Sequence, residues 1–405
     1  MWASAGLVVL LFFLQADHGA RGLKALEEGK WAEAAEALER AVAADPTDYG
    51  AQFNLAFANT MLGRKAEAIS GYQKVLELKP GLYQAQVNLG ILFLEEKQES
   101  KALPLLRAAA AQAPDKFPPN FYLAQALYAA ADDAGAVQSY RKAVELDAKA
   151  AVAWIGLGRA LANQSKFEEA LEAYRKAGEA DPSHREYLIE LAARLEEKGH
   201  PERAIALYRE FPDRPEVRER LGNLLFQAGQ IEEAVPHLEA AVKESPTAAN
   251  RLALAAAYLK SKRPEEAGPL LELALRDSPE NLELRMTYGR LLRDLKKYGA
   301  AAREFLEAAK IAPQSNEAWS ELAGMLVLLD NHPQALVALD RVQALDPQNA
   351  GVHFFRAMIL DRSKQYEAAL NSYEKFLAMA NGAYPDEEFK ARQRMKVIRK
   401  ELNRR

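Results

Sequence analysis

Residues 151–184 read AVAWIGLGRALANQSKFEEALEAYRKAGEADPSH. In this stretch the small residue Gly158 stands twelve residues before Ala170, and the large residue Tyr174 stands four residues after it. Such an arrangement predicts two helices that cross closely, because small residues let two backbones approach and a large side chain fills the groove beside them. Pro182 then ends the segment, since proline cannot continue a helix.

The alanine of this stretch recurs along the whole chain. Eleven alanines follow one another at intervals of 34 residues, except for one interval of 30 and one of 33. They are Ala34, Ala68, Ala102, Ala136, Ala170, Ala204, Ala234, Ala267, Ala301, Ala335 and Ala369. Only Gly or Ala stands twelve residues before each of them, and only Tyr, Phe or Leu stands four residues after. A fixed period of this size is typical of a stacked-repeat protein, in which each repeat packs against its neighbours.

The pattern resembles that of the tetratricopeptide repeat (TPR) family. The stretch at 151–184 carries the family's packing residues most fully, at Trp154, Leu157, Gly158, Leu161, Ala170, Tyr174, Ala177 and Pro182. The likeness extends over residues 15–383. It implies an all-α fold, a TPR α-solenoid of about eleven helix-turn-helix repeats that form a right-handed superhelix. It implies a binding function and no particular chemistry, because the family is defined by its packing residues.

The sixth repeat is irregular. Its second helix is expected to end early at Phe211-Pro212-Asp213-Arg214-Pro215, since prolines stop a helix. We therefore expect a bend or hinge there, between repeats one to six at residues 17–211 and repeats seven to eleven at residues 212–383. The packing pattern resumes at once with Leu221 and Gly222, so a true domain boundary is the weaker interpretation.

The last residues, 384–405, predict a basic amphipathic capping helix. Beyond Glu388 the chain holds eight basic residues and one acidic residue. The apolar stripe expected on this helix consists of Phe389, Met395, Ile398 and Leu402. An open array needs a polar-faced cap over its last hydrophobic surface, and this helix suits that task. Attraction of the basic residues to anionic lipid or nucleic acid is the alternative interpretation.

Residues 1–16 differ from everything that follows. The run from Met1 to Leu14 has no charged side chain, and its apolar core is shorter than the roughly 20 residues that span a bilayer. It fits the hydrophobic region of a secretory signal peptide, with Leu14-Gln15-Ala16 as the cleavage site, although no Lys or Arg precedes it. We expect a signal peptide or a short apolar anchor that tethers the protein to a membrane, and hence export to the periplasm or the extracellular space. A cytosolic docking segment is the third interpretation.

Composition argues against several classes of function. The 405 residues carry a net charge of −4 and include no cysteine. A chain of this charge offers no global attraction to nucleic acid, and without cysteine it forms neither disulfides nor thiolate metal sites. No pair among its six histidines has the i, i+4 spacing of a helical metal site. We therefore expect a non-enzymatic protein with no metal, no cofactor and no nucleic acid, whose partner is a protein or peptide.

The first helices of the second to fourth repeats carry a second apolar stripe. In TPR proteins these helices line the concave face, so the resemblance implies that the stripe points into a groove. The predicted groove residues are Phe53, Phe57, Met61, Val87, Ile91, Leu94, Phe121 and Tyr128. We interpret them as a site for an extended or helical apolar peptide segment. Two alternatives stay open: these side chains thicken the core between the helices, or residues 5–14 fold back into the groove.

Later repeats are different at the corresponding positions. The seventh and ninth repeats have polar or charged residues there, namely Glu219, Asn223, Arg290 and Arg293. A ligand that spans the array would therefore meet an apolar end and a charged end, although such charges are also typical of a solvated face.

Two binding modes of the family do not fit this chain. Chaperone-binding members hold a carboxylate with a Lys at the position where Phe53 and Val87 stand here. Members that track peptides with a long asparagine ladder would continue the series that here stops after Asn54 and Asn88. The sequence thus predicts a protein–protein interaction scaffold that binds an apolar peptide segment in its concave groove. The alternative is a membrane-tethered assembly factor for an envelope biosynthesis or secretion complex.

Overall fold

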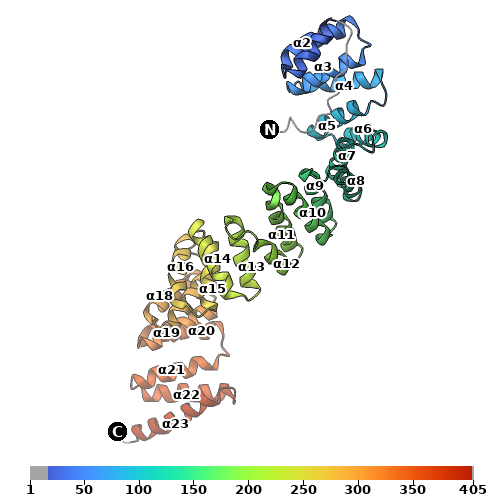
Figure 1. Cartoon of the computed structure of the whole chain (residues 1–405). Coiled ribbons are helices and arrows are strands. Elements are labelled where there is room, and N and C mark those ends of the chain that lie inside the picture. Colours follow the sequence, from blue (N-terminus) through green and yellow to red (C-terminus); the bar gives the residue numbers. More distant parts are fainter. Residues whose placement is uncertain (1–16, 404–405) are drawn as a thin grey trace. The chain divides into compact units, whose positions relative to one another are not determined.

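A computed structural model describes residues 17–403, which consist of helices joined by short turns and contain no β-strand (Figure 1). The predicted signal peptide or anchor at residues 1–16 lies outside the described residues. The chain divides into two compact units: an N-terminal unit that ends at Phe211 and a C-terminal unit that begins at Pro212. The all-α repeat fold is confirmed.

The N-terminal unit contains twelve α-helices and one short 3-10 helix within its described residues. Their bounds are α1 (Asp17–Glu27), α2 (Trp31–Ala44), α3 (Tyr49–Met61), α4 (Lys65–Leu78), α5 (Tyr83–Glu95), α6 (Glu99–Gln112), α7 (Phe117–Ala129), α8 (Asp133–Leu146), α9 (Ala151–Asn163), α10 (Phe167–Ala180), η1 (Pro182–Glu186), α11 (Tyr187–Glu197) and α12 (Pro201–Tyr208).

The C-terminal unit continues with eleven α-helices up to residue 403. Their bounds are α13 (Pro215–Gln227), α14 (Ile231–Glu244), α15 (Ala248–Lys260), α16 (Pro264–Asp277), α17 (Leu282–Asp294), α18 (Tyr298–Ile311), α19 (Asn316–Leu328), α20 (His332–Leu345), α21 (Ala350–Arg362), α22 (Tyr366–Ala380) and α23 (Pro385–Leu402).

Each repeat predicted from the sequence is one pair of these helices. An odd-numbered helix packs against the even-numbered helix that follows it. Successive pairs also contact one another within each unit, from α1–α2 to α11–α12 in the first and from α13–α14 to α21–α22 in the second. The short turn inside a pair is exemplified by Gly63, which has a φ of 71°. Its backbone N–H donates to the Thr60 carbonyl at 3.0 Å, and the Arg64 N–H donates to the Asn59 carbonyl at 2.9 Å. These two bonds satisfy the end of α3, and they let the chain reverse into α4.

The helix pairs cross where the sequence predicts. A Cβ atom added to Gly158 would lie 3.0 Å from the ring of Tyr174, and one added to Gly289 would lie 2.6 Å from the ring of Phe305. Contacts below about 3.4 Å are tighter than ordinary van der Waals packing, so only glycine lets these helices approach so closely. In both cases the two residues are sixteen positions apart, which is the spacing between the small and the large residue of each repeat.

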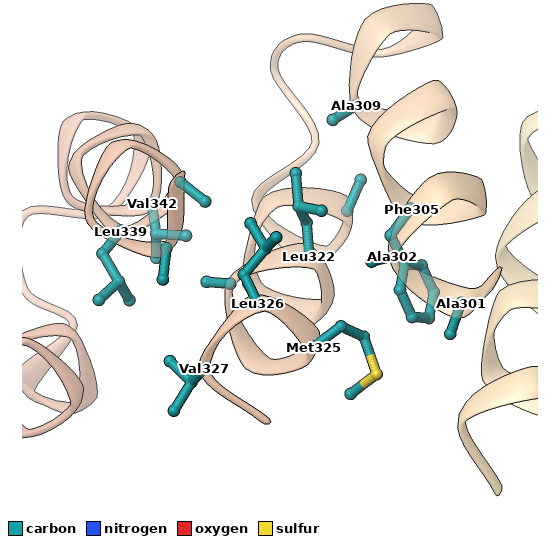
Figure 2. Close-up of a cluster of buried hydrophobic side chains, with 14 of the residues drawn as sticks. Ala301, Ala302, Phe305, Ala309, Leu322, Met325, Leu326, Val327, Leu339 and Val342 are labelled. Carbon is teal, nitrogen blue, oxygen red and sulfur yellow. The ribbon is translucent and has the colours of Figure 1, made fainter. Parts of the chain in front are cut away.

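The same residues also join one repeat to the next. Figure 2 shows Ala301, Ala302 and Phe305 of α18 facing Leu322 and Met325 of α19. Because helix pairs bury their apolar side chains against neighbouring pairs, the core of each unit consists of several clusters along the array instead of a single central one.

The irregular sixth repeat is present as expected. Helix α12 has only 8 residues, whereas α10 has 14, and it ends at Tyr208 before the two prolines. The boundary between the two compact units falls just after it, between Phe211 and Pro212. The bend or hinge at this place and the right-handed superhelix of the whole array stay predictions.

The last helix covers the end of the array. Met395 and Ile398 of α23 are buried in a cluster with Phe376 of α22, which supports the predicted capping role. The predicted stripe is wrong at Phe389, whose side chain is 64% exposed. The buried face instead runs from Ala391 through Met395 to Ile398, because residues three or four positions apart lie on the same side of a helix. Phe389 is six residues before Met395 and therefore lies on another side.

Candidate functional site

The eight predicted groove residues occupy the first helices α3, α5 and α7, and we call them the N-terminal apolar face. Phe53 and Val87 are fully buried in a cluster that also contains Tyr72, so these two side chains contribute to the core between helices. Phe57 and Phe121 are also buried. The remaining four are half-buried: Met61, Ile91, Leu94 and Tyr128. The half-buried side chains are thus the ones that solvent reaches.

Two buried amides lie on the same helices. The Asn88 Nδ2 group of α5 donates to the Tyr72 hydroxyl at 3.1 Å. Burial raises the pKa of that hydroxyl well above its usual range, so it stays neutral and keeps its proton. Asn54 of α3 is 1% exposed, and its Nδ2 group has no hydrogen-bond partner among the described residues. A buried donor without an acceptor costs about 1–3 kcal/mol.

Other first helices carry ion pairs in place of apolar side chains. In the N-terminal unit, Arg159 of α9 donates from Nη2 to Glu190 of α11 at 2.8 Å. In the C-terminal unit, Arg293 of α17 donates from Nη1 to Glu321 of α19 at 2.7 Å, and Arg290 pairs with Glu317 on the same two helices. The arginines predicted to form a charged surface are therefore largely neutralised by carboxylates of the next repeat.

A cavity of about 600 Å³ lies at the other end of the chain, where the sequence predicted no site. Its apolar lining comes from Phe354 and Met358 of α21, Tyr373 of α22, and Phe389 and Val397 of α23. One signal for it was in the sequence. Phe354 stands at the same position of its repeat as Phe53, and Met358 at the same position as Phe57.

Neither metal chemistry nor a membrane span has a structural candidate in residues 17–403. No group of three or more His, Asp or Glu side chains among them could hold a metal ion. None of the described helices is both long and apolar enough to cross a bilayer. Pairs of glutamates occupy the first turns of α10, α14 and α16, as Glu168 and Glu169 do in α10, where negative charge complements the helix dipole.

Comparison with known proteins gives partial matches. Anaphase-promoting complex subunit 3 of Schizosaccharomyces pombe is 30% identical over 116 residues, which are 29% of this chain and 17% of that protein. A solved structure of MamA from Desulfovibrio magneticus RS-1 is 25% identical, with a TM-score of 0.39, over 41% of this chain and 94% of that one. The structure of Naa15/Naa10 bound to HypK-THB has 17% identity and a TM-score of 0.45, over 88% of this chain and 62% of that one.

Family models match along most of the chain. Four models, all described as tetratricopeptide repeat, cover residues 20–83, 151–184, 189–249, 219–282, 258–326 and 350–382. These ranges contain most of the helix pairs and the packing alanines that set their spacing. The chain belongs to the tetratricopeptide repeat family.

Proposed function

We propose that this protein is a non-enzymatic scaffold that binds an apolar peptide segment of a partner protein along α3, α5 and α7. TPR proteins generally mediate protein–protein interactions and are typically non-catalytic. The observation that carries the proposal is the half-buried set Met61, Ile91, Leu94 and Tyr128. Apolar side chains left partly exposed on neighbouring elements are typical of a peptide-binding surface.

The polar groups of these helices lie beneath the surface. Asn54 and Asn88 are buried, and Asn88 donates to the Tyr72 hydroxyl. An arriving segment would thus meet mainly apolar contacts for its side chains. A strongly charged segment would lose its hydration on this face without gaining an ion pair, which favours an apolar one.

The test is a fluorescence titration with a labelled peptide Gly-Ser-Leu-Val-Leu-Phe-Leu-Ser-Gly. The wild-type protein is expected to bind it more tightly than a version in which Ser replaces every apolar residue. Ile91→Glu and Leu94→Glu should each weaken binding by about ten-fold or more, because a carboxylate would be desolvated against the apolar segment. Both side chains are half-buried at the edge of the core cluster, and neither is the small or the large residue of its repeat, so the variants are expected to fold with some loss of stability.

Val337→Glu is the matched control. Val337 is 59% exposed on α20, so the same change of an aliphatic residue to Glu should leave binding unchanged. Equal binding by the wild type and by both glutamate variants, with circular dichroism showing all of them folded, would refute the proposed site. Equal binding of the apolar and the serine peptides would refute the proposed ligand class.

The membrane-tethered assembly factor is the alternative, and it depends on the ends of the chain. It predicts that removal of residues 1–16 or 386–405 impairs function more than Ile91→Glu does. Our proposal of export is tested by the intact mass and the fractionation of the natively produced protein. A soluble envelope species that starts near Asp17 would support export, and a full-length membrane-bound species would favour the tethered role.

A further inference from the structure

Three helices, α21, α22 and α23, line the cavity at the end of the array. Phe354 and Met358 of α21 and Tyr373 of α22 line it from the last repeat, and Phe389 and Val397 line it from α23. Its volume of about 600 Å³ is within the usual range of a ligand site, and far above that of a packing defect.

Helix α23 has two apolar faces, and only one of them is used in the cap. Met395 and Ile398 are buried against the last repeat. Phe389 and Val397, which line the cavity, are 64% and 44% exposed. Eight residues separate them, so they lie about two turns apart on nearly the same side of the helix. Large apolar side chains held this far out of the core are available to a partner.

An ion pair fixes the wall of the cavity. Arg394 of α23 donates from Nε to Asp361 Oδ2 of α21 at 2.5 Å and from Nη2 to Oδ1 at 3.0 Å. Asp361 is only 8% exposed. A two-point contact of a planar guanidinium with a buried carboxylate holds the two helices in one register, so the cavity is preformed.

The surroundings of the cavity are positive. Three of the residues that line it are basic, namely Arg362, Lys390 and Arg394, and one is acidic, Asp361. Asp361, the acidic residue of the lining, is already paired with Arg394. Lys390 lines the cavity and forms no hydrogen bond or ion pair with the described residues. A ligand with carboxylates would thus gain charge complementarity around an apolar centre.

We propose that this cavity, which we call the C-terminal pocket, binds a segment of a partner protein that has an apolar side chain flanked by Asp or Glu. The apolar side chain contacts Phe354, Met358 and Val397, and a neighbouring carboxylate pairs with Lys390. This site is separate from the N-terminal apolar face and does not depend on it.

Two other occupants of this cavity, a second copy of the chain and a lipid bilayer, fit less well. A second copy that placed its own α23 against this one would bring like charges together, and like charges repel. A bilayer would require α23 to insert an apolar face, but Met395 and Ile398 are already covered by the last repeat. Only Phe389 and Val397 remain as exposed large apolar side chains on α23, and two such side chains are a small area with which to anchor a helix in a bilayer.

The experiment uses the full chain and a labelled peptide Glu-Asp-Leu-Phe-Asp-Glu, followed by fluorescence anisotropy. We expect binding that weakens as salt increases, and no binding of the same peptide with Lys in place of every acidic residue. Val397→Glu, which places a carboxylate in the pocket, and Lys390→Glu, which reverses its charge, should each weaken binding by about ten-fold or more. Lys390→Glu should also remove most of the salt dependence.

Two controls match these changes. Val337→Glu repeats the first substitution at an exposed valine of α20, and Lys375→Glu repeats the second at an exposed lysine of α22 that does not line the pocket. Both should bind as the wild type does. Retained binding in Val397→Glu, or equal losses in the controls, would show that the peptide binds elsewhere and would overturn the proposal.

Two further outcomes also decide the question. The proposal is wrong if neither this peptide nor its versions with Met, Ile or Trp in place of Phe bind better than the lysine peptide. It is also wrong if phosphatidylglycerol vesicles bind the protein, lose it on Lys390→Glu, and no peptide binds, since the basic helix would then serve a membrane. Loss of the apolar peptide on Ile91→Glu with retention of the acidic one would separate this site from the N-terminal apolar face.

Discussion

The first helices of the repeats present two kinds of surface on one kind of packing. In α3, α5 and α7 the predicted groove positions that stay half-buried are apolar, as at Ile91 and Leu94. At these two positions of its repeat α17 holds Arg290 and Arg293, which pair with glutamates of α19. The crossing of Gly90 with Leu106 nevertheless resembles that of Gly289 with Phe305. A Cβ atom added to either glycine would lie 2.6 Å from the side chain of its partner. The repeat pattern therefore sets the fold, and specificity depends on positions that the pattern leaves unconstrained.

The largest expected effect is a loss of stability when the helix crossing that both regions share is truncated. Phe305→Ala in α18 should destabilise its unit by about 3–5 kcal/mol, and Leu106→Ala in α6 by about 2–5 kcal/mol. Both side chains are fully buried and fill the groove beside a glycine, so each truncation leaves a cavity. Urea unfolding followed by circular dichroism measures both losses.

A small loss of stability in one region would contradict the claim that both regions share the same packing. If either truncation cost less than about 1 kcal/mol, that crossing would not contribute as its burial implies. Val337→Ala serves as the control, because a 59% exposed side chain should change the free energy of unfolding by no more than about 0.5 kcal/mol.

A smaller effect is expected at the ion pairs that distinguish the surface of α17 and α19 from that of α5. Replacing Arg293 and Glu321 together by Leu would give α17 and α19 an apolar surface like that of α5. The exposed fractions of the two side chains are 34% and 21%, so loss of the pair should cost only about 0.2–1 kcal/mol. The double variant should bind an apolar dye such as anilinonaphthalene sulfonate better than the wild type. Unchanged dye binding would show that ion pairs are not what distinguishes the two surfaces.

The smallest effect is a difference in pH dependence. Burial, together with Arg356 and Lys375, lowers the pKa of His353 in α21 below its usual value of 6.5. The unfolded chain then takes up the proton more readily, so this histidine contributes its full stabilisation above about pH 6.5 and loses it as pH falls through the lower folded pKa. The helices α3, α5 and α7 contain no histidine.

Thermal melting between about pH 5 and pH 8 tests this point. The wild-type C-terminal unit should lose stability toward the acidic end, and His353→Gln should lose less over the same range. An identical pH profile of the wild type and the variant would contradict the shifted pKa of His353.

The packing of the fold was predictable because it repeats. Gly158 and Tyr174 meet through the same sixteen-residue spacing as Gly289 and Phe305, so each repeat supports the interpretation of the others. Features that occur once gave less information. The side of α23 that faces the last repeat depends on how one helix docks, and its sequence alone did not show that Ala391 is inside and Phe389 outside.

The candidate sites were harder to predict for a related reason. The sequence shows that the stripe on α3 and α5 is apolar, but only the structure shows that Phe53 and Val87 are buried while Ile91 stays half-buried. Burial depends on neighbouring repeats and not on the spacing within one helix. The C-terminal pocket also needs α23 beside α21, so repeat positions such as that of Phe354 indicate half of it at most.

Hydrogen–deuterium exchange with and without the apolar peptide Gly-Ser-Leu-Val-Leu-Phe-Leu-Ser-Gly tests the central claim most directly, because it reports on every helix at once. Our account predicts that the peptide slows exchange in α3, α5 and α7 and leaves α17 and α19 unchanged. Protection confined to α17 and α19, or to α21 and α23, would contradict the account, since the apolar segment would then bind where we place no site for it.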